Sequence, residues 1–472
     1  MLTKSRNSIA EDLKRFISNE QVLSTDEEIA IYEQDATNTR ISKMPPDAIV
    51  FPKHIVDVQT VLRYASKRNI PVVCRGAGTN LVGGCLPDFG GIVLNFSKMT
   101  RIYDLNETDM TVKVEAGVVL NDLLKETEKH GLFFPIDPSN MAVSTIGGAI
   151  AQSSGGAKTF KYGSIKDYIL GLKVVTADGE IINTGSNTIK NSTGYHLEQL
   201  FVGSEGTLGI IVEATLKLIP KPQERRVLMA YFDSVSDAVN SVNEVIKSKL
   251  VPSAIEFMDK NSLVSVENYN PNGLLTDKEA ALIIETDGND LDIQQEKIEN
   301  CLKSMNAVGI KIAKTEEEIE NIWKSRRASF AAAAKLAPDV MTEDVIVPRS
   351  KLPDLVLGVR DICDKYNLQV CMIGHVGDGN LHPQIVLNME DDEQFKNYMS
   401  AKGEIYRLTD KLGGILSAEH GIGSDKSAYL YDVIDKNTLI YMKKMKKMFD
   451  PNNILNPGKI FNDIGVNRGT EE

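Results

Sequence analysis

Residues 70–84 read IPVVCRGAGTNLVGG, an apolar strand-like run that passes directly into a glycine-rich loop. Glycines after a strand allow backbone amide groups to approach a phosphate closely. The dinucleotide fingerprint G-x-G-x-x-G does not fit, because Leu81 stands where the third glycine should be and GGIVLNFSKM (90–99) predicts a strand instead of a helix. A P-loop is excluded because no Gly-Lys-Ser/Thr follows. The loop therefore predicts a phosphate-containing ligand bound in neither of these two common ways.

Three further segments share this chemistry. They are PIDPSN (135–140), STIGGAIAQSSGGAKTFKYGSIKD (144–167) and VGSEGTLGII (202–211). The alternative is that these glycines only form turns. We consider this less suitable because four separate segments share the same small-residue composition. Small residues in four separated loops indicate one long ligand that lies against the backbone along its length.

In this order, the four segments resemble the FAD-binding domain of the vanillyl-alcohol-oxidase superfamily, over about residues 44–222. The resemblance implies that the first loop holds the FAD pyrophosphate through Arg75, Gly76, Ala77, Gly78, Thr79 and Asn80. It implies that the rest of the FAD site is lined by Pro138, Ser144, Thr145, Gly148, Gly155, Tyr162, Gly163, Glu205, Gly206 and Ile211. Many members attach flavin covalently through a histidine where this chain has Thr79, so we expect non-covalent FAD.

Composition limits the class of protein. A chain of 472 residues is expected to form two or more domains. Its net charge of −12 argues against a nucleic-acid partner, and no apolar run approaches the ~20 residues of a transmembrane segment. The five cysteines are odd in number and contain no C-x-x-C pair, which predicts a reducing, cytoplasmic location and no iron–sulfur cluster.

The second half begins after KLIPKP (217–222), whose prolines predict a hinge. Alternating strand and helix patterns then predict an α+β domain with an antiparallel sheet. This half resembles the FAD-linked oxidase C domain found in D-lactate dehydrogenases, in D-2-hydroxyglutarate dehydrogenases and in the D-type chain of glycolate oxidase. The predicted fold is a two-domain α+β flavoprotein of the vanillyl-alcohol-oxidase type. We divide it into an N-terminal helical segment (1–43), an FAD-binding domain (44–222), an antiparallel-sheet cap or substrate domain (223–415) and a C-terminal segment that returns to the FAD site (416–472).

Two of the six histidines lie in GHVGDGNLH (374–382). A two-residue turn at Asp378-Gly379 would pair His375 with His382, placing their Cβ atoms roughly 5 Å apart on one face, close enough to share a metal ion. A glycine-rich loop with incidental histidines is the alternative. SAEHGIG (417–423) adds Glu419 and His420, and both can serve one site only if the chain bends there, which Gly421 and Gly423 allow. The resemblance implies a divalent zinc, iron or manganese ion on His375, His382 and Glu419, with His420 as catalytic base.

The substrate carboxylate requires a guanidinium group, and by resemblance Arg326 in WKSRRASF (323–330) supplies it, with Arg327 as a near alternative. Where D-2-hydroxyglutarate enzymes carry a lysine, this chain reads Thr342-Glu343-Asp344, and these acidic groups are expected to repel a second carboxylate. A small monocarboxylate is therefore favoured. FDPNNILNPGKIF (449–461) also matches the family and implies that Asn456 returns the chain to the flavin.

The sequence thus predicts an FAD- and metal-dependent dehydrogenase of a small D-2-hydroxy acid, with D-lactate favoured. His420 takes the hydroxyl proton while hydride passes from Cα to the flavin. The D-type chain of a glycolate oxidase and a D-2-hydroxyglutarate dehydrogenase are close alternatives; a metallohydrolase and a non-catalytic electron relay are alternatives of other classes. Electrons must then leave to another protein, a quinone or oxygen, and the resemblance implies an electron-transferring flavoprotein. In YMKKMKKM (441–448), the Tyr and Met stripe predicts a packed face and the lysines a solvated or partner-docking face.

Overall fold

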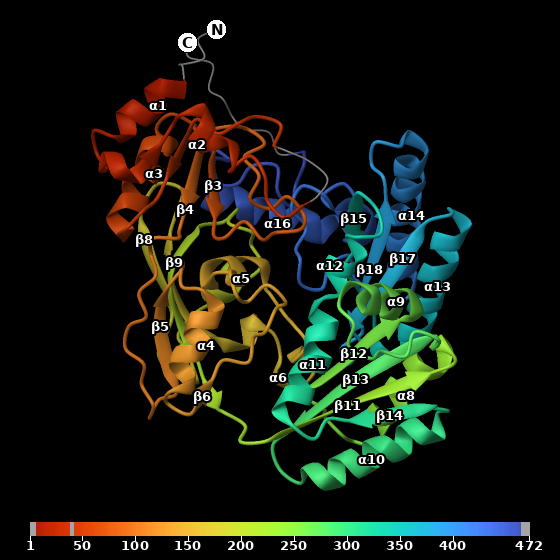
Figure 1. Ribbon diagram of the computed structural model, residues 1–472. Coiled ribbons are helices and arrows are strands. Elements are labelled where there is room, and N and C mark those ends of the chain that lie inside the picture. The colour runs from red at the N-terminus through yellow and green to blue at the C-terminus, as the bar shows by residue number, and fades with distance from the viewer. Residues whose placement is uncertain (1–5, 38–41, 464–472) are drawn as a thin grey trace.

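The computed structural model describes residues 6–37 and 42–463 and has two domains side by side (Figure 1). The domain that contains the N-terminal half is built on two four-stranded sheets. The first sheet has the order β1-β2-β4-β3 and joins Val22–Leu23, Ala48–Val50, Ile92–Asn95 and Val72–Arg75. The second is antiparallel, has the order β5-β9-β7-β8 and joins Thr111–Glu115, Ile210–Lys217, Ile169–Val175 and Ile181–Gly185.

Short helices surround these sheets. They are α1 (Arg6–Leu13), α2 (Asp26–Ala30), α3 (Ile55–Ser66), α4 (Leu120–Glu128), α5 (Ile146–Gln152), α6 (Thr159–Tyr162) and α7 (Leu197–Phe201), with 3-10 turns at Asn19–Gln21 and Ile165–Tyr168. Two further short strands, β6 (Leu132–Phe133) and β10 (Ile219–Pro220), pair near the hinge. The N-terminal segment is part of this domain, because β1 pairs with β2.

The glycine loop and its neighbours are largely as predicted. Strand β3 leads into residues 76–91, which contain no regular element, and β4 follows instead of a helix. The prediction of a loop was wrong at α5. Ile146, Ala149 and Ile150 are buried at helical spacing, so this small-residue stretch packs one apolar face against the second sheet.

The second domain is a single antiparallel sheet with helices on both faces (Figure 1), which confirms the predicted fold class. Its strand order is β14-β11-β13-β12-β17-β18-β15, with β16 beside β18. These strands are β11 (Arg225–Phe232), β12 (Ala254–Asp259), β13 (Ala280–Asp287), β14 (Gly309–Ile312), β15 (Asp339–Thr342), β16 (Val345–Ile346), β17 (Gln369–His375) and β18 (Asn380–Leu387).

The two faces of this sheet have different roles. The outer face packs on α8 (Val235–Lys247), α10 (Leu291–Ser304), α13 (Leu352–Lys365) and α14 (Asp392–Lys411) and forms the largest apolar core. The inner face carries α9 (Lys260–Tyr269), α11 (Glu316–Arg327) and α12 (Ser329–Ala333), which lie toward the first domain (Figure 1). Side chains of the inner face are therefore available to a site between the domains.

The C-terminal segment returns to the first domain. After α15 (Leu430–Val433) and α16 (Lys436–Phe449), Leu455 bridges to Val72 of β3. The prediction for α16 was wrong at Tyr441 and Met448, which are 65% and 67% exposed, whereas Lys444 and Lys447 are exposed as predicted. Lys446 is buried instead, since its ammonium donates to backbone carbonyls of Thr207 and Leu455 and fixes the helix to the first domain.

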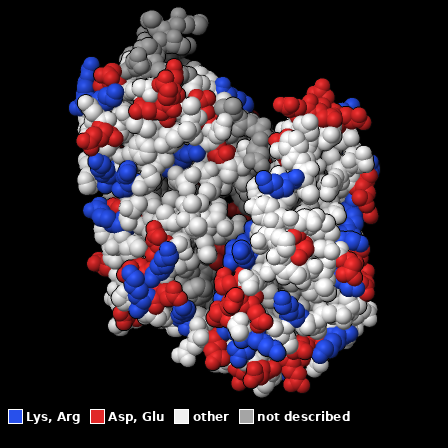
Figure 2. Space-filling view, in the orientation of Figure 1, with Lys and Arg blue, Asp and Glu red and all other residues white. Residues whose placement is uncertain are grey.

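No helix among the described residues is both long and apolar enough to cross a membrane. On the face drawn in Figure 2, basic side chains are interspersed with acidic ones and form no continuous basic surface. All five cysteines are unpaired, and burial raises the pKa of the Cys85 thiol to about 12, so it is a poor nucleophile.

Candidate functional site

A cavity lined mostly by small residues lies in the first domain, where β3, α5 and the loop before β9 meet. The space between its walls, open solvent included, is about 1230 Å³. Its lining includes many of the residues predicted for FAD: Arg75, Gly76, Ala77, Gly78, Thr79, Asn80, Pro138, Ser144, Thr145, Gly148, Glu205, Gly206 and Ile211. The four segments that share small residues in the sequence thus meet around one space.

Two glycines of the cavity lining are required for steric reasons. A Cβ on Gly76 would lie 2.3 Å from Oγ1 of Thr145, and a Cβ on Gly78 would lie 2.2 Å from the guanidinium of Arg75. Gly78 also has a φ of +75°, which other residues rarely adopt. A side chain at either position would displace Thr145 or Arg75, so glycine is required for this shape of the cavity wall.

Four predicted FAD residues lie outside the lining. Gly155 and Gly163 flank α6, and the Tyr162 hydroxyl donates to Asp287 of the second domain, 2.9 Å away. Asn456 supports the wall from behind, since its amide donates to the carbonyls of Gly84 and Glu205, both of which line the cavity.

The histidines of GHVGDGNLH meet on the inner face of the second domain's sheet. The ring centroids of His375 and His382 are 5.1 Å apart. The predicted register was wrong: His382 pairs with Ile373, and His375 pairs with Glu256 of β12. The turn spans residues 376–379 and shifts the pairing by two residues. Because side chains alternate with a period of two, such a shift keeps both histidines on one face.

Glu419 completes a three-sided cluster with these histidines. Its Oε1 lies 3.4 Å from Nε2 of His375 and 3.5 Å from Nε2 of His382. Two ligand atoms on a tetrahedral metal at about 2.1 Å are separated by about 3.4 Å, so these spacings fit one ion. The three ligand atoms lie within 4.8 Å of one another. The donor set of two imidazoles and one carboxylate leaves an open coordination position for a substrate.

A second possible ligand set, Asp344 with His382 and His420, is less suitable. One oxygen of Asp344 already accepts the Ser417 hydroxyl and three backbone N–H groups, and the other accepts the Asn380 amide. This carboxylate has little remaining capacity for a cation. Of the two sets, the cluster that contains Glu419 is therefore the better candidate to hold a cation.

Asp344 instead explains how Glu419 and His420 serve one site. The backbone N–H groups of residues 418–420 all donate to one of its oxygens at 2.9–3.0 Å, which bends the chain sharply. Glu205 then accepts the N–H groups of Ile422 and Gly423 at 2.7 and 2.8 Å. The bend required by the sequence is therefore built by two buried carboxylates that the glycines alone did not predict.

Charges in the cluster are strongly coupled. Burial raises the pKa of the Glu419 carboxyl, but the imidazoles, first His375, outweigh burial and lower that pKa to about 2. Burial and the nearby His375 lower the pKa of His382 to about 3. Burial also raises the pKa of Asp344, yet His420 and Lys426 reverse this and hold it well below its usual range. Both carboxylates are thus ionised at neutral pH, which favours a bound cation.

His420 lies between the cavity and the cluster. Both Glu419 and His420 line the cavity. The His420 ring is stacked on His382, with centroids 5.3 Å apart and planes 14° apart, and its Nδ1 is buried without a hydrogen-bond partner among the described residues. The predicted base thus faces both the predicted FAD site and the predicted metal site.

Arg326 lies at the end of α11 and is 8% exposed. Its guanidinium pairs with Oε2 of Glu256 at 2.8 Å, while its Nε has no partner among the described residues. Arg327, the alternative, is on the surface and pairs with Glu320. Of the two arginines, Arg326 is therefore the one that lies beside the cluster, through its pair with Glu256.

The prediction that Glu343 and Asp344 repel a second substrate carboxylate was wrong. Glu343 is 1% exposed and accepts the hydroxyls of Tyr398 and Tyr406, while Asp344 accepts the loop amides. Neither carboxylate is free to repel a substrate. The position still carries no lysine that could bind a second carboxylate.

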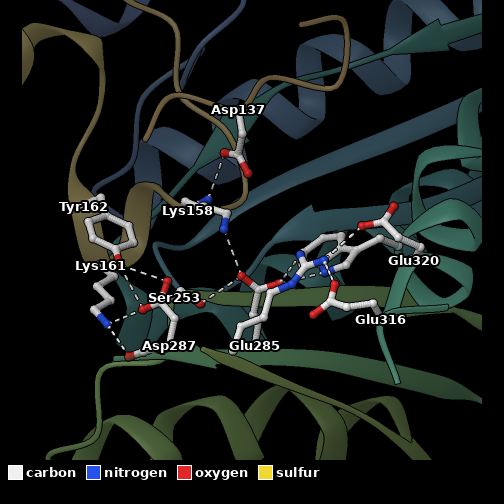
Figure 3. A network of polar contacts seen from close by, with 11 residues as sticks. Asp137, Lys158, Lys161, Tyr162, Ser253, Glu285, Asp287, Glu316 and Glu320 are labelled. Carbon is white, nitrogen blue, oxygen red and sulfur yellow. Dashed lines mark hydrogen bonds and ion pairs between the residues drawn. The ribbon is translucent and has the colours of Figure 1, made fainter. Parts of the chain in front are cut away.

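A polar network fixes the two domains to each other beside the site (Figure 3). Lys158 of the first domain donates to Glu285 of β13 at 2.9 Å, and Glu285 also accepts Ser253 and the Trp323 indole. Burial raises the pKa of nearby Asp137 to about 7. Breaking a buried ion pair is costly, so the network holds the histidine cluster in a fixed position relative to the cavity.

Sequence reasoning missed Glu256 and Glu285 as parts of this region, and it placed Asp344 here with the wrong role. All three are almost fully buried carboxylates. The signal for two of them was their place in apolar strands, as in SAIEFMD (253–259) and EAALIIETDG (279–288), since a buried charge requires a partner. The identity of those partners could not be read from the sequence.

Comparison with known proteins agrees with this architecture. Residues 46–185 match the family model described as FAD binding domain, and residues 221–460 match the model of FAD linked oxidases, C-terminal domain. The chain is 41% identical to glycolate oxidase subunit GlcD of Bacillus subtilis, over 91% of this chain and 92% of that protein. It is 36% identical to D-lactate dehydrogenase of Archaeoglobus fulgidus, over 87% and 90% of the two chains.

Among solved structures, p-cresol methylhydroxylase superposes with a TM-score of 0.81 over 98% of this chain and 97% of that one, at 15% identity. At this identity the similarity concerns the fold alone. It confirms the predicted vanillyl-alcohol-oxidase type of architecture.

Proposed function

The chain belongs to the FAD-linked oxidases, and on that premise we propose that it oxidises a small D-2-hydroxy acid, with D-lactate as the favoured substrate. One observation carries this proposal: Glu419 belongs both to the lining of the glycine-rich cavity and to the histidine cluster, and His420 lines the cavity while its ring stacks on His382. A substrate at this junction would contact a base, a metal site and the flavin site together. A hydrolase would need the cluster but would have no use for the cavity.

Each group of the chain has a role suited to its place. Arg326 binds the substrate carboxylate through its free donors. His420 takes the proton of the C2 hydroxyl. A divalent ion held by His375, His382 and Glu419 would lower the pKa of that hydroxyl. FAD, when bound, accepts the hydride of the C2 carbon, so the two electrons and two protons of the alcohol are accounted for.

The substrate is the finer part of the proposal. Positions 341–344 offer no lysine for a second carboxylate, which favours lactate or glycolate over 2-hydroxyglutarate. Glycolate is the principal alternative, because the relative at 41% identity is a glycolate oxidase subunit. We propose an electron-transferring flavoprotein or a sister chain as acceptor, and the reducing cytoplasm as the location, in keeping with five unpaired cysteines.

The test is an anaerobic absorbance spectrum of the purified holoenzyme before and after adding D-lactate, L-lactate, glycolate or D-2-hydroxyglutarate. We expect the flavin band to bleach with D-lactate. Bleaching by glycolate alone would keep the reaction class and replace the substrate. A flavin band that no hydroxy acid bleaches in metal-replete protein would overturn the proposed reaction.

The same preparation tests the metal. Treatment with a chelator followed by its removal is expected to abolish bleaching by substrate and to leave the oxidised flavin spectrum unchanged. Bleaching should return when Zn²⁺, Mn²⁺ or Fe²⁺ is added, and the most effective ion identifies the metal. Undiminished bleaching in fully metal-free protein would exclude a catalytic ion.

A further inference from the structure

Glu256 joins two groups that the proposed reaction uses separately. It lies in the middle of β12, is 1% exposed and is paired directly opposite His375 of β17. One of its oxygens lies 2.7 Å from Nδ1 of His375, and the other lies 2.8 Å from the guanidinium of Arg326. A single carboxylate therefore contacts both a metal-ligand histidine and the arginine assigned to the substrate.

The contact with His375 determines which of its two ring nitrogens can bind a metal ion. An ionised carboxylate only accepts hydrogen bonds, so Nδ1 must carry the proton in this contact. Nε2, which faces Glu419 at 3.4 Å, is therefore the ring nitrogen that can offer a lone pair to a metal ion, in exchange for any proton it carries. A carboxylate behind a ligating histidine also orients the ring and increases its basicity.

The contact with Arg326 determines where a substrate carboxylate would lie relative to His375. The guanidinium is nearly buried and forms its ion pair with Glu256, so Glu256 is what holds the arginine at the inner face of the sheet. The Nε atom, which has no partner among the described residues, belongs to the same planar group. A substrate carboxylate on Arg326 would thus be placed relative to His375 through one shared side chain.

We propose that Glu256 is a positioning residue that couples metal retention to binding of the substrate carboxylate. The proposal rests on the proposed function for the role of Arg326, but its metal half can be measured without turnover. Replacement of Glu256 is expected to loosen both groups at once. A carboxylate that merely stabilised the sheet would affect neither selectively.

The matched control is Glu285, one strand away on β13. It is also buried and ion-paired to an arginine, Arg225, and to Lys158, but its ion pairs among the described residues include none with the histidines. The Glu256→Gln and Glu285→Gln variants thus remove the same charge from the same sheet. Melting temperature and FAD absorbance show whether each variant is folded and loaded.

The first measurement is Zn²⁺ affinity of the metal-stripped holoenzyme, by competition with a chromophoric chelator. We expect Glu256→Gln to weaken Zn²⁺ binding by about 10- to 100-fold. Glu285→Gln should remain close to the unsubstituted protein. Equal affinity in Glu256→Gln and the unsubstituted protein, or equal losses in both variants, would overturn the proposal. Since this measurement needs no hydroxy acid, a wrong substrate assignment cannot imitate its failure.

The second measurement separates the two halves of the coupling. At saturating metal, Glu256→Gln is expected to recover kcat while KM for the hydroxy acid stays raised by about 10-fold, because Arg326 has lost its anchor. Recovery of both constants on adding metal would overturn the Arg326 half. If the unsubstituted enzyme oxidises none of the acids yet Glu256→Gln still loses Zn²⁺, the proposed function fails while the metal half of this inference stands.

Discussion

The cavity and the histidine cluster adjoin each other but are built in opposite ways. The cavity is shaped by backbone, and its glycines matter because a Cβ at Gly76 or Gly78 would collide with the side chain of Thr145 or Arg75. The cluster is shaped by side chains from β17, β18 and the loop 417–423, held by the buried carboxylates of Glu256 and Asp344. A site built from backbone can therefore be recognised from contiguous sequence motifs. A site built from side chains also depends on residues that hold those side chains in place and lie far away in the sequence.

The largest expected effect concerns His420, where the two regions meet. His420→Asn removes the proposed base while leaving the glycine cradle intact. We expect flavin reduction by substrate to slow by about 10²- to 10⁴-fold, measured by anaerobic stopped flow. FAD content should be unchanged. His130→Asn, which alters a surface histidine paired with Glu107, serves as control. An unimpaired rate in His420→Asn would assign the base elsewhere.

The next effect is a pH dependence at the junction of the regions. Burial raises the pKa of Asp137 to about 7, above its usual value near 4, so the folded protein holds a proton there that the unfolded chain releases. The contribution of Asp137 to the stability of the FAD-free protein should therefore fall as pH rises from about 4 to about 7, by up to about 4 kcal/mol, because one pKa unit corresponds to about 1.4 kcal/mol. His382, whose pKa is lowered to about 3, contributes in the opposite direction, so the Asp137 contribution is read from the difference between the Asp137→Asn variant and the unsubstituted protein.

Asp137→Asn should flatten that dependence, since an amide does not titrate. The measurement is the urea midpoint of the FAD-free protein at pH 5 and at pH 8, for both proteins. The amide oxygen can still accept the N–H group of Lys158, so the fold should be retained. An identical loss of stability between the two pH values in both proteins would contradict the assignment to Asp137.

A third prediction concerns the support of the cluster. Asp344→Asn replaces an ionised acceptor of three loop amides with a neutral one. Loss of charge-assisted hydrogen bonds should lower stability by about 2 to 3 kcal/mol and should also slow substrate-driven flavin reduction. Glu343→Gln is the matched control, because that neighbouring carboxylate accepts the Tyr398 and Tyr406 hydroxyls instead of the loop. Equal slowing in both variants would mean that the loop is not what Asp344 controls.

The smallest effect is expected in the cradle. The Cβ introduced by Gly76→Ala would meet Oγ1 of Thr145, and overpacking of this kind costs about 1 to 3 kcal/mol. We expect FAD affinity to fall by about 10- to 100-fold in a fluorescence titration of the FAD-free protein. Gly76→Ala combined with Thr145→Ala should recover part of the loss. No recovery, with Thr145→Ala alone unaffected, would show that the clash lies with another group.

Much of the first domain could be predicted from the sequence, because its signals are local. Strand patterns at 72–75 and 92–95 and the loop between them appear as predicted, and the four small-residue segments line one cavity. Helix α5 was missed because small residues suit both a loop and a closely packed helix. The burial of Lys446 in α16 was missed because this side chain finds its acceptors only after the C-terminal segment has returned to β3.

By itself, the sequence determined where glycines leave the backbone without side chains. It also determined that His375 and His382 lie on one face of the sheet, because side chains alternate with a period of two and the register shifts by two residues. Only the tertiary structure decided which carboxylates support which groups: Glu256 behind His375 and Arg326, Asp344 behind the loop 417–423, and Glu285 across the domain boundary. The physical reason is that a buried charge must find partners of opposite charge or hydrogen-bond donors. Those partners are brought together by packing between elements that are far apart in the chain. Glu256 and His375 are separated by more than a hundred residues, as are Lys158 and Glu285. No local sequence pattern can identify such a pair.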